Sequence, residues 1–262
     1  MPLKFKTGRK APIITQRGLR MAAAFGKTTA SFGPPPLSSF PYYRAVEAIV
    51  GKSWKMFLND QLGCCTRASS AHAIMVWTAN GSGGMVTPTD RDVLAAYERD
   101  GYVPGHPTTD QGAEEREVSL DLIRNGMAGR RIEMAAPIFM GTVDDVILAR
   151  LKWAIQLYGG VRLGVNLPRS AETMFDRGLP WDLTGDNTLD GGHDMRAVAY
   201  DLDYVHAITW GTRVKLTWPW VKKFLEEAHA EMSPDLIRIN GTSPPGFHHA
   251  TLVTDLAAVA AS

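Results

Sequence analysis

Cysteine is scarce in this sequence: the 262 residues contain only Cys64 and Cys65, which are neighbours. Two adjacent cysteines exclude a disulfide framework and favour a reducing, intracellular origin. Long hydrophobic runs are absent as well, since no apolar stretch approaches the roughly 18–20 residues that would span a membrane. The basic N-terminus has no apolar core segment, so we expect no secretory signal peptide.

Acidic residues are missing from the beginning of the chain, where none precedes Glu47. Eight of the 28 basic residues lie in that stretch, so the remainder holds 20 against 27 acidic residues, a balance of −7. Residues 1–46 show no helical or strand period, and Gly33 to Pro36 can continue neither element. We therefore predict an extended basic N-terminal arm over 1–46 and an acidic folded domain over 47–262.

Several motifs of catalytic and binding sites are also missing. The sequence has no HExxH, no paired CxxC, no calcium-binding loop and no GxSxG elbow, and Gly81 to Gly84 lack the lysine of a phosphate loop. We accordingly expect no metal and no cofactor.

Helical patterns dominate the first part of the chain and short strands the second. Apolar spacing and caps predict helices over 65–79, 113–125, 142–158, 218–231 and 248–259, and one that Thr87 caps and that runs to about Tyr97. Short strands are predicted over 161–167, 195–201, 204–210, 213–218 and 236–239. Helices followed by strands predict an α+β fold with two lobes that meet at a cleft.

Cys65 is the first candidate for chemistry. It follows Gly63 and Cys64 at the first turn of a predicted helix, where unpaired N–H groups and the helix dipole favour a thiolate. We expect its pKa to be depressed and its alkylation to be faster than that of Cys64. The alternative is a small buried cysteine pair with a packing role only.

His193 is the second candidate, because it follows Gly191 and Gly192 at the start of an apolar strand. A cysteine nucleophile needs such a base within hydrogen-bond reach, so we expect His193 within about 4 Å of Cys65. A structural histidine remains the alternative.

The order of these motifs resembles that of the papain-like cysteine peptidases. That family has a glutamine six positions before its nucleophile, which corresponds to Asn59 here, and a glycine-histidine pair, which corresponds to Gly192-His193. Asp110 to Gly112 are similar to the glycine-rich strip that lines the family's substrate cleft, and Ile208 to Gly211 to its Asn-Ser-Trp-Gly. The resemblance implies a papain-like two-lobed fold, with Cys65 and His193 as a catalytic pair and Asn59 as an oxyanion donor.

One departure from the family weakens the expectation of activity. The asparagine that orients the histidine falls on Ile208, which cannot hydrogen-bond. Thr209, Asp194 and Asp190 are alternatives for that role.

The sequence also resembles short papain-like proteins of bacteria and tailed phages. The shared patterns are Asn-Asp-x-x-Gly-x-Cys at 59–65, Trp-Thr-Ala-Asn, Thr-Pro-Thr-Asp and Thr-Trp-Gly. Together with the arm and Ile208, this implies a structural component of a tailed-phage virion, located in the virion or the host cytoplasm. Its partners would be protein subunits of a symmetric assembly, with the arm lying across a neighbour on anchors such as Phe5, Ile14 and Phe25.

Two other functions stay open. The alternative to the structural role is an active cysteine peptidase or amidase that uses a Cys65–His193 dyad on a peptide substrate. A nucleic-acid binder is disfavoured, because the acidic domain repels phosphate and the arm offers few aromatic residues for stacking.

Overall fold

Helix α3 (Cys65–Asn80) lies at the centre of the computed structural model, which describes residues 5–15 and 24–261. All of its residues except Ala79 are buried. Small side chains such as Ala68, Ser70 and Ala71 allow neighbours to pack closely on every side, so this helix has no solvated face. The predicted helix over 65–79 is thus confirmed.

The strands form one antiparallel sheet in the order β1-β6-β2-β3-β4-β5. Their bounds are Met134–Met140 (β1), Val161–Pro168 (β2), Leu189–Tyr200 (β3), Tyr204–Thr209 (β4), Thr212–Thr217 (β5) and Leu225–Met232 (β6). The meander of β3, β4 and β5 is the one that the sequence predicts.

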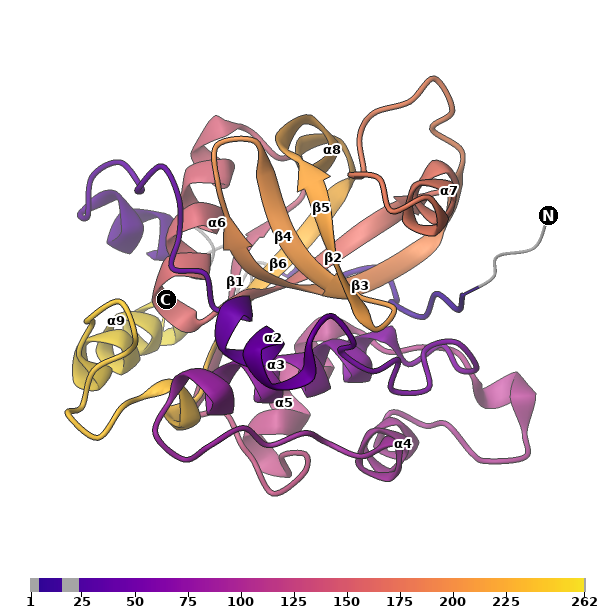
Figure 1. Ribbon diagram of the computed structural model, residues 1–262, viewed down its shortest axis with the longest axis horizontal. Coiled ribbons are helices and arrows are strands. Elements are labelled where there is room, and N and C mark those ends of the chain that lie inside the picture. Colours follow the sequence, from indigo (N-terminus) through magenta and orange to yellow (C-terminus); the bar gives the residue numbers. More distant parts are fainter. Residues whose placement is uncertain (1–4, 16–23, 262) are drawn as a thin grey trace.

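The remaining helices divide between the two sides of this sheet (Figure 1). On the side of α3 lie α2 (Tyr43–Val50), α4 (Asp90–Arg99) and α5 (Glu115–Arg124). The sheet is also accompanied by α6 (Asp145–Tyr158), α7 (Ser170–Asp176), α8 (Trp218–Phe224) and α9 (His249–Ala261), and by the short 3-10 turns η1 (Pro107–Thr109) and η2 (Pro234–Leu236). The α+β, two-lobed architecture is therefore as expected.

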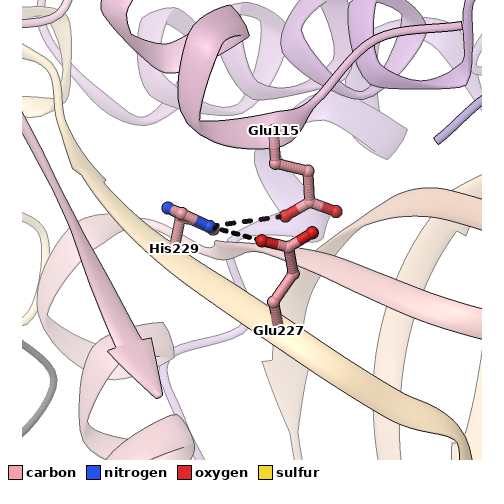
Figure 2. Close-up of side chains that lie close together, drawn as sticks. All are labelled: Glu115, Glu227 and His229. Carbon is pink, nitrogen blue, oxygen red and sulfur yellow. Dashed lines mark hydrogen bonds and ion pairs between the residues drawn. The ribbon is translucent and has the colours of Figure 1, made fainter. Parts of the chain in front are cut away.

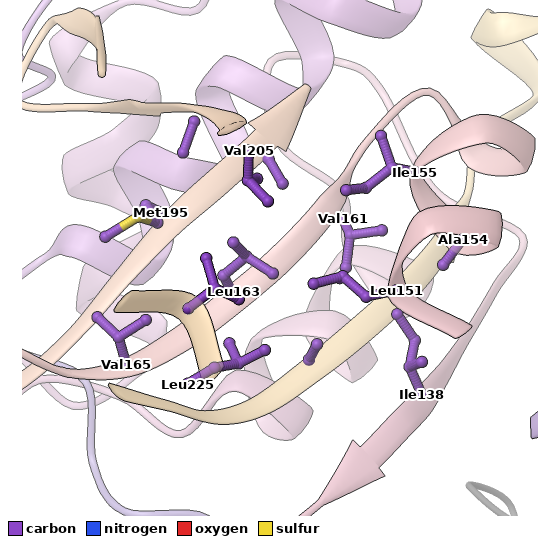
Figure 3. Close-up of a cluster of buried hydrophobic side chains, with 14 of the residues drawn as sticks. Ile138, Leu151, Ala154, Ile155, Val161, Leu163, Val165, Met195, Val205 and Leu225 are labelled. Carbon is purple, nitrogen blue, oxygen red and sulfur yellow. The ribbon is translucent and has the colours of Figure 1, made fainter. Parts of the chain in front are cut away.

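Each lobe has its own hydrophobic core. One core lies between the sheet and α6, with Leu163, Met195 and Leu151 among its members (Figure 3). The other surrounds α3 and includes Ile74 and Trp77, together with Ile208 from β4. Because side chains alternate along a strand, Ile208 enters the helical core while its neighbours on β4 face the other way.

Three sequence predictions are wrong in detail. The predicted helix over 218–231 ends at Phe224, and the chain continues as strand β6 between β1 and β2. Residues 236–239 form no strand: Leu236 ends the turn η2, and residues 237–239 continue as irregular chain and turn. The cap of α4 is Thr89 rather than Thr87, because Thr89 and Asp92 form a reciprocal capping box. Strand β1 is a further element that we did not predict.

The N-terminal arm contacts the chain's own body at several of its described residues. Residues 24–30 are helical, and Phe5 and Phe25 are buried in the core of the β lobe, whereas Ile14 is exposed. The body of the same chain covers Phe5 and Phe25, and the expected path across a neighbouring subunit stays a prediction. The start of the arm (1–4) and residues 16–23 lie outside the described residues.

Among residues 5–15 and 24–261, no helix has the length and apolar character needed to cross a membrane.

Candidate active site

Cys65 is the first residue of α3, as predicted, and its side chain is buried. The backbone N–H groups of Asp194 on β3 and of Gly8 in the arm lie beside the thiol and act to lower its pKa. Cys65 therefore lies where the helical lobe, strand β3 and the arm meet. Its neighbour Cys64 points elsewhere, and its thiol donates to the carbonyl of Phe57 at 3.4 Å.

His193 lies on β3, directly before the residue whose N–H contacts the Cys65 thiol. Its Nε2 lies 2.6 Å from the hydroxyl of Thr209 at the end of β4, and its ring packs at 5.0 Å from that of Trp210. The other nitrogen, Nδ1, is buried and has no hydrogen-bond partner among the described residues. The structure gives no hydrogen bond between this ring and Cys65, so the expected dyad stays a prediction.

Thr209 thus takes the orienting position that the sequence comparison assigned to Ile208. Adjacent residues of a strand face opposite ways, so Ile208 is buried in the helical core while Thr209 reaches His193. The two other candidates are engaged elsewhere: Asp194 pairs with Arg162, and Asp190 with Arg169.

Asn59 is buried beside the same site, where its side-chain amide donates to peptide carbonyls. Its Nδ2 lies 3.1 Å from the carbonyl oxygen of Lys6 in the arm and 3.2 Å from that of Leu62. An oxyanion donor would present such an amide to a developing oxyanion, whereas here the acceptors are carbonyl oxygens of the chain itself. Gln61, in contrast, is exposed.

The arm lies between Gly192 on β3 and residues 112–113, and we call the space that it occupies the groove. The amide of Arg9 donates to the carbonyl of Gly192 at 3.1 Å, and the amide of Ala113 donates to the carbonyl of Gly8 at 2.8 Å. The amide of Lys10 in turn donates to the carbonyl of Ala113 at 2.9 Å, so the arm runs parallel to residues 112–113. Gly112, the last residue of the strip over 110–112, lies against Gly8, and the arm is bound beside it like an added strand.

Glycines make this close approach possible. A Cβ on Gly8 would lie 1.7 Å from the carbonyl oxygen of Gly63, and one on Gly112 would lie 1.7 Å from that of Gly8. Real Cβ atoms do not come that close to backbone, so neither position accepts a side chain while the arm is in place.

Burial keeps the candidate pair neutral. It raises the pKa of the Cys65 thiol to about 12, against our expectation from the helix N-terminus, and the Asp194 carboxylate adds to the effect. Burial likewise lowers the pKa of His193 to about 3, with a contribution from the positive charge of Arg9. With the arm in place the thiol is protonated and the imidazole uncharged, so the nucleophilic form is suppressed.

The side chain of Arg9 leaves the groove and enters an acidic pocket. Its guanidinium donates to Glu227 at 2.7 Å and to Glu226, and only 1% of the side chain is exposed. Burial lowers the pKa of Arg9, but the carboxylates of Glu115, Glu226 and Glu227 raise it by more. The pKa of Arg9 therefore lies above its usual value. The sequence offered no signal for this pair, because 218 residues separate Arg9 from Glu227.

A cluster of side chains that could bind a metal ion lies in the same pocket. Glu115 at the start of α5 and two residues of β6, Glu227 and His229, direct possible ligand atoms to within 4.8 Å of one another (Figure 2). His229 Nε2 lies 3.0 Å from Glu227 and 3.9 Å from Glu115. Carboxylate and imidazole ligands suit zinc, but Arg9 brings a positive charge to the same carboxylates.

Further buried charged side chains, on strands β2, β3 and β6, lie beside the pocket. Arg162 pairs with Asp194 at 2.5 Å and with Glu231 at 3.2 Å, and Arg196 pairs with Glu231 at 2.6 Å. Arg162 also donates to the carbonyl of Thr66 in α3. These pairs connect the sheet to the first turn of the helix that carries Cys65.

Comparison with known proteins defines the fold. No family model matches the sequence, and no curated protein matches it. Xylellain, a cysteine protease from Xylella fastidiosa, superposes with a TM-score of 0.59 over 88% of this chain and 97% of its own, at 14% identity. ProCathepsin B S9 from Trypanosoma congolense gives a TM-score of 0.56 over 87% and 86%, at 10% identity. The Carica candamarcensis protease CMS1MS2 gives 0.51 over 75% and 98%, at 13% identity.

The chain therefore has the papain-like cysteine protease fold, as the sequence motifs indicated. At 10–14% identity the likeness concerns the fold alone.

Proposed function

We propose that this protein is a papain-like cysteine peptidase or amidase held in a latent state by its own arm. The observation that carries the proposal is the 2.6 Å contact between Thr209 and Nε2 of His193. It supplies the orienting hydrogen bond that Ile208 cannot provide, and Nδ1 stays available for a thiol proton.

The reaction would begin when the arm leaves the groove and the Gly8 N–H no longer contacts the thiol. Cys65 then passes its proton to Nδ1 of His193, and the sulfur attacks the carbonyl carbon of a peptide or amide. The side-chain amide of Asn59 and the backbone N–H of Cys65 stabilise the oxyanion. His193 returns the proton to the leaving amine, and water then hydrolyses the thioester to restore the thiol.

The arm supports latency because it covers every group that this reaction needs. The carbonyl of Lys6 accepts from Asn59, the N–H of Gly8 lies beside the Cys65 thiol, and the amide of Arg9 donates to Gly192, the residue before His193. A substrate cannot reach these groups without displacing residues 6–9.

A structural role in a phage virion remains a prediction without a supporting observation. Its sequence arguments were the missing orienting residue and an arm that docks on a neighbour. The argument from the missing residue loses its basis because Thr209 contacts His193. The argument from docking is weakened because Phe5 and Phe25 pack in the chain's own core.

The test compares full-length wild type with Gly8→Ala, whose new Cβ would collide with Gly63 and displace the arm. Gly83→Ala is the matched control, because a Cβ there meets no atom within 4 Å. We expect iodoacetamide at mildly acidic pH to alkylate Cys65 faster than Cys64 only in Gly8→Ala. Adding His193→Ala should remove that advantage, and only Gly8→Ala should hydrolyse a peptide mixture.

Trypsin cleavage after Arg9 reports arm displacement independently of the thiol. If Gly8→Ala is cleaved there while Cys65 and Cys64 stay equally slow and no peptide is hydrolysed, the catalytic proposal is wrong.

A further inference from the structure

The backbone beside Arg9 is held as a bound peptide would be held. Its amide donates to Gly192, and its neighbours Gly8 and Lys10 pair with Ala113 on the other wall of the groove. Main-chain pairing of this kind supplies affinity without sequence preference, so selectivity must come from side-chain pockets. Arg9 is the only residue among 6–10 whose side chain enters the acidic pocket described above.

The acids around Arg9 have few other partners. Asp194 and Glu231 pair with Arg162 and Arg196, whereas the carboxylate of Glu227 forms ion pairs only with Arg9 and His229 among the described residues. When the arm leaves, at least one buried carboxylate loses its cation. An uncompensated buried charge is costly, so an emptied pocket strongly favours a new cation.

Glu115 points to the same place and is not satisfied. Both of its carboxylate oxygens are buried without a hydrogen-bond partner among the described residues. Burial, together with the charges of Glu227 and Asp194, raises the pKa of Glu115 well above its usual range. The pocket thus holds unused acceptor capacity next to the cation that it already binds.

The floor of the pocket is shaped for a long side chain. A Cβ on Gly164 would lie 2.3 Å from Oε1 of Glu115 and 2.8 Å from Cδ of Arg9. Only glycine at this position leaves room for both the acid and the arginine stem. The planar fork of a guanidinium reaches Glu226 and Glu227 together, which the point charge of a lysine does less well.

We infer that the pocket of Glu115, Glu226 and Glu227 selects an arginine side chain of a bound peptide, and that Arg9 imitates this ligand in the latent form. The inference rests on the proposed function in one respect: the peptide lies in the groove beside Cys65. A divalent metal on Glu115, Glu227 and His229 is the competing occupant, and the guanidinium is favoured because Arg9 is seated there.

Binding of labelled peptides tests this without any turnover. The probe is a fluorescein-labelled hexapeptide with the sequence of residues 5–10, Phe-Lys-Thr-Gly-Arg-Lys, and its partner carries uncharged citrulline in place of the arginine. Fluorescence anisotropy with full-length Gly8→Ala should show at least about tenfold tighter binding of the arginine peptide. Wild type, whose groove is filled, should bind neither.

Two further variants locate the preference. Glu227→Gln in the Gly8→Ala background should reduce the preference to less than about threefold, because the fork loses its most buried acceptor. Glu117→Gln is the matched control, since Glu117 is half exposed on α5 and contacts Arg116 instead. It should leave the preference unchanged.

A second measurement covers the case in which Gly8→Ala does not fold. In full-length Arg9→Gln the backbone of the arm stays compatible with the groove and the pocket loses its cation. Methylguanidine should then raise the melting temperature by about 2–4 °C, while methylurea should not, and wild type should respond to neither.

Equal binding of the arginine and citrulline peptides to a folded Gly8→Ala would overturn the inference. So would zinc ions that raise the melting temperature of Arg9→Gln where methylguanidine does not. Thiol reactivity and peptide hydrolysis are measured separately. A selective pocket beside an inert Cys65 would therefore refute the proposed function alone, and a reactive Cys65 without arginine preference would refute this inference alone.

Discussion

The hydroxyl of Thr209 lies 2.6 Å from Nε2 of His193, and it does so one position after the residue that the family motif assigns to this role. The shift by one residue follows from the strand, because Ile208 and Thr209 face opposite sides of the sheet. The hydroxyl therefore orients the ring, while Nδ1 has no hydrogen-bond partner among the described residues.

Removing the Thr209 hydroxyl tests this contact. Thr209→Val should lower the free energy of unfolding by about 1–3 kcal/mol, because it leaves a buried ring nitrogen unsatisfied. In the Gly8→Ala background it should also slow alkylation of Cys65. Thr209→Ser keeps the hydroxyl and is the control. Denaturant unfolding and alkylation rates measure both effects, and equal values for the valine and serine variants would refute an orienting role.

Much of the fold was predictable because its signals are local. Helix α6 ends at Tyr158 with Gly159 in a left-handed conformation, as a terminal glycine predicts. Strand β6 was not predictable in this way: Leu225 to Met232 contains alanines and glutamates that favour a helix, and only pairing with β1 and β2 makes it a strand.

The residues of the site differ in the same way, because some have local sequence signals and others depend on long-range pairing. Cys65 and His193 lie in local motifs, a glycine shortly before a helix and a glycine pair directly before a histidine on an apolar strand, so the sequence points to both. The partner of Arg9 lies 218 residues away, and a basic arm without acids gives no local sign that one arginine is buried. Pairings of that separation become visible only when the chain is folded.

Acid should destabilise the protein through its buried neutral histidines. Burial lowers the pKa of His72 to about 4 and that of His193 to about 3, both below the unfolded value of 6.5. Each histidine therefore contributes stability that is complete above pH 6.5 and is lost as the pH falls through its folded pKa. Urea unfolding between pH 7 and pH 4 should show this decline.

His72→Gln isolates one of these two contributions. Glutamine retains a donor for the carbonyls of Trp54 and Lys55, which His72 Nε2 contacts at 3.2 and 3.1 Å. Between pH 6.5 and pH 4 the free energy of unfolding of the variant should depend less steeply on pH than that of wild type. The slope should be smaller by up to about 1.4 kcal/mol per pH unit. His106→Gln, at an exposed position, is the control. An unchanged slope in His72→Gln would contradict the assignment.

Breaking the buried ion cluster should be costly. Arg162→Met leaves Asp194 and Glu231 without this cation, so we expect the free energy of unfolding to fall by about 3–5 kcal/mol. Arg116→Met removes an arginine whose pair with Glu117 is half exposed, and it should change stability by less than about 1 kcal/mol. Denaturant midpoints compare the two, and similar effects would show that the cluster does not stabilise the fold.

Phe5 should control whether the arm stays in the groove. Its ring stacks on Trp210 at 4.6 Å and meets Phe175 edge-on at 5.2 Å, so it anchors the segment that covers Cys65. Phe5→Ala removes this contact, and because Arg9 is almost fully buried in wild type, trypsin should cleave after Arg9 only once the arm is released. We expect that cleavage to accelerate at least about tenfold in Phe5→Ala, which corresponds to about 1.4 kcal/mol of lost anchoring.

Ile13→Ala is the control, because Ile13 is 63% exposed and its loss should leave the arm in place. Mass spectrometry of the early fragments, at a trypsin concentration that leaves the remaining body intact, measures the rate. If Phe5→Ala and Ile13→Ala were cleaved equally slowly, Phe5 would not be the anchor and the latency of the groove would depend on the backbone pairing and Arg9 alone.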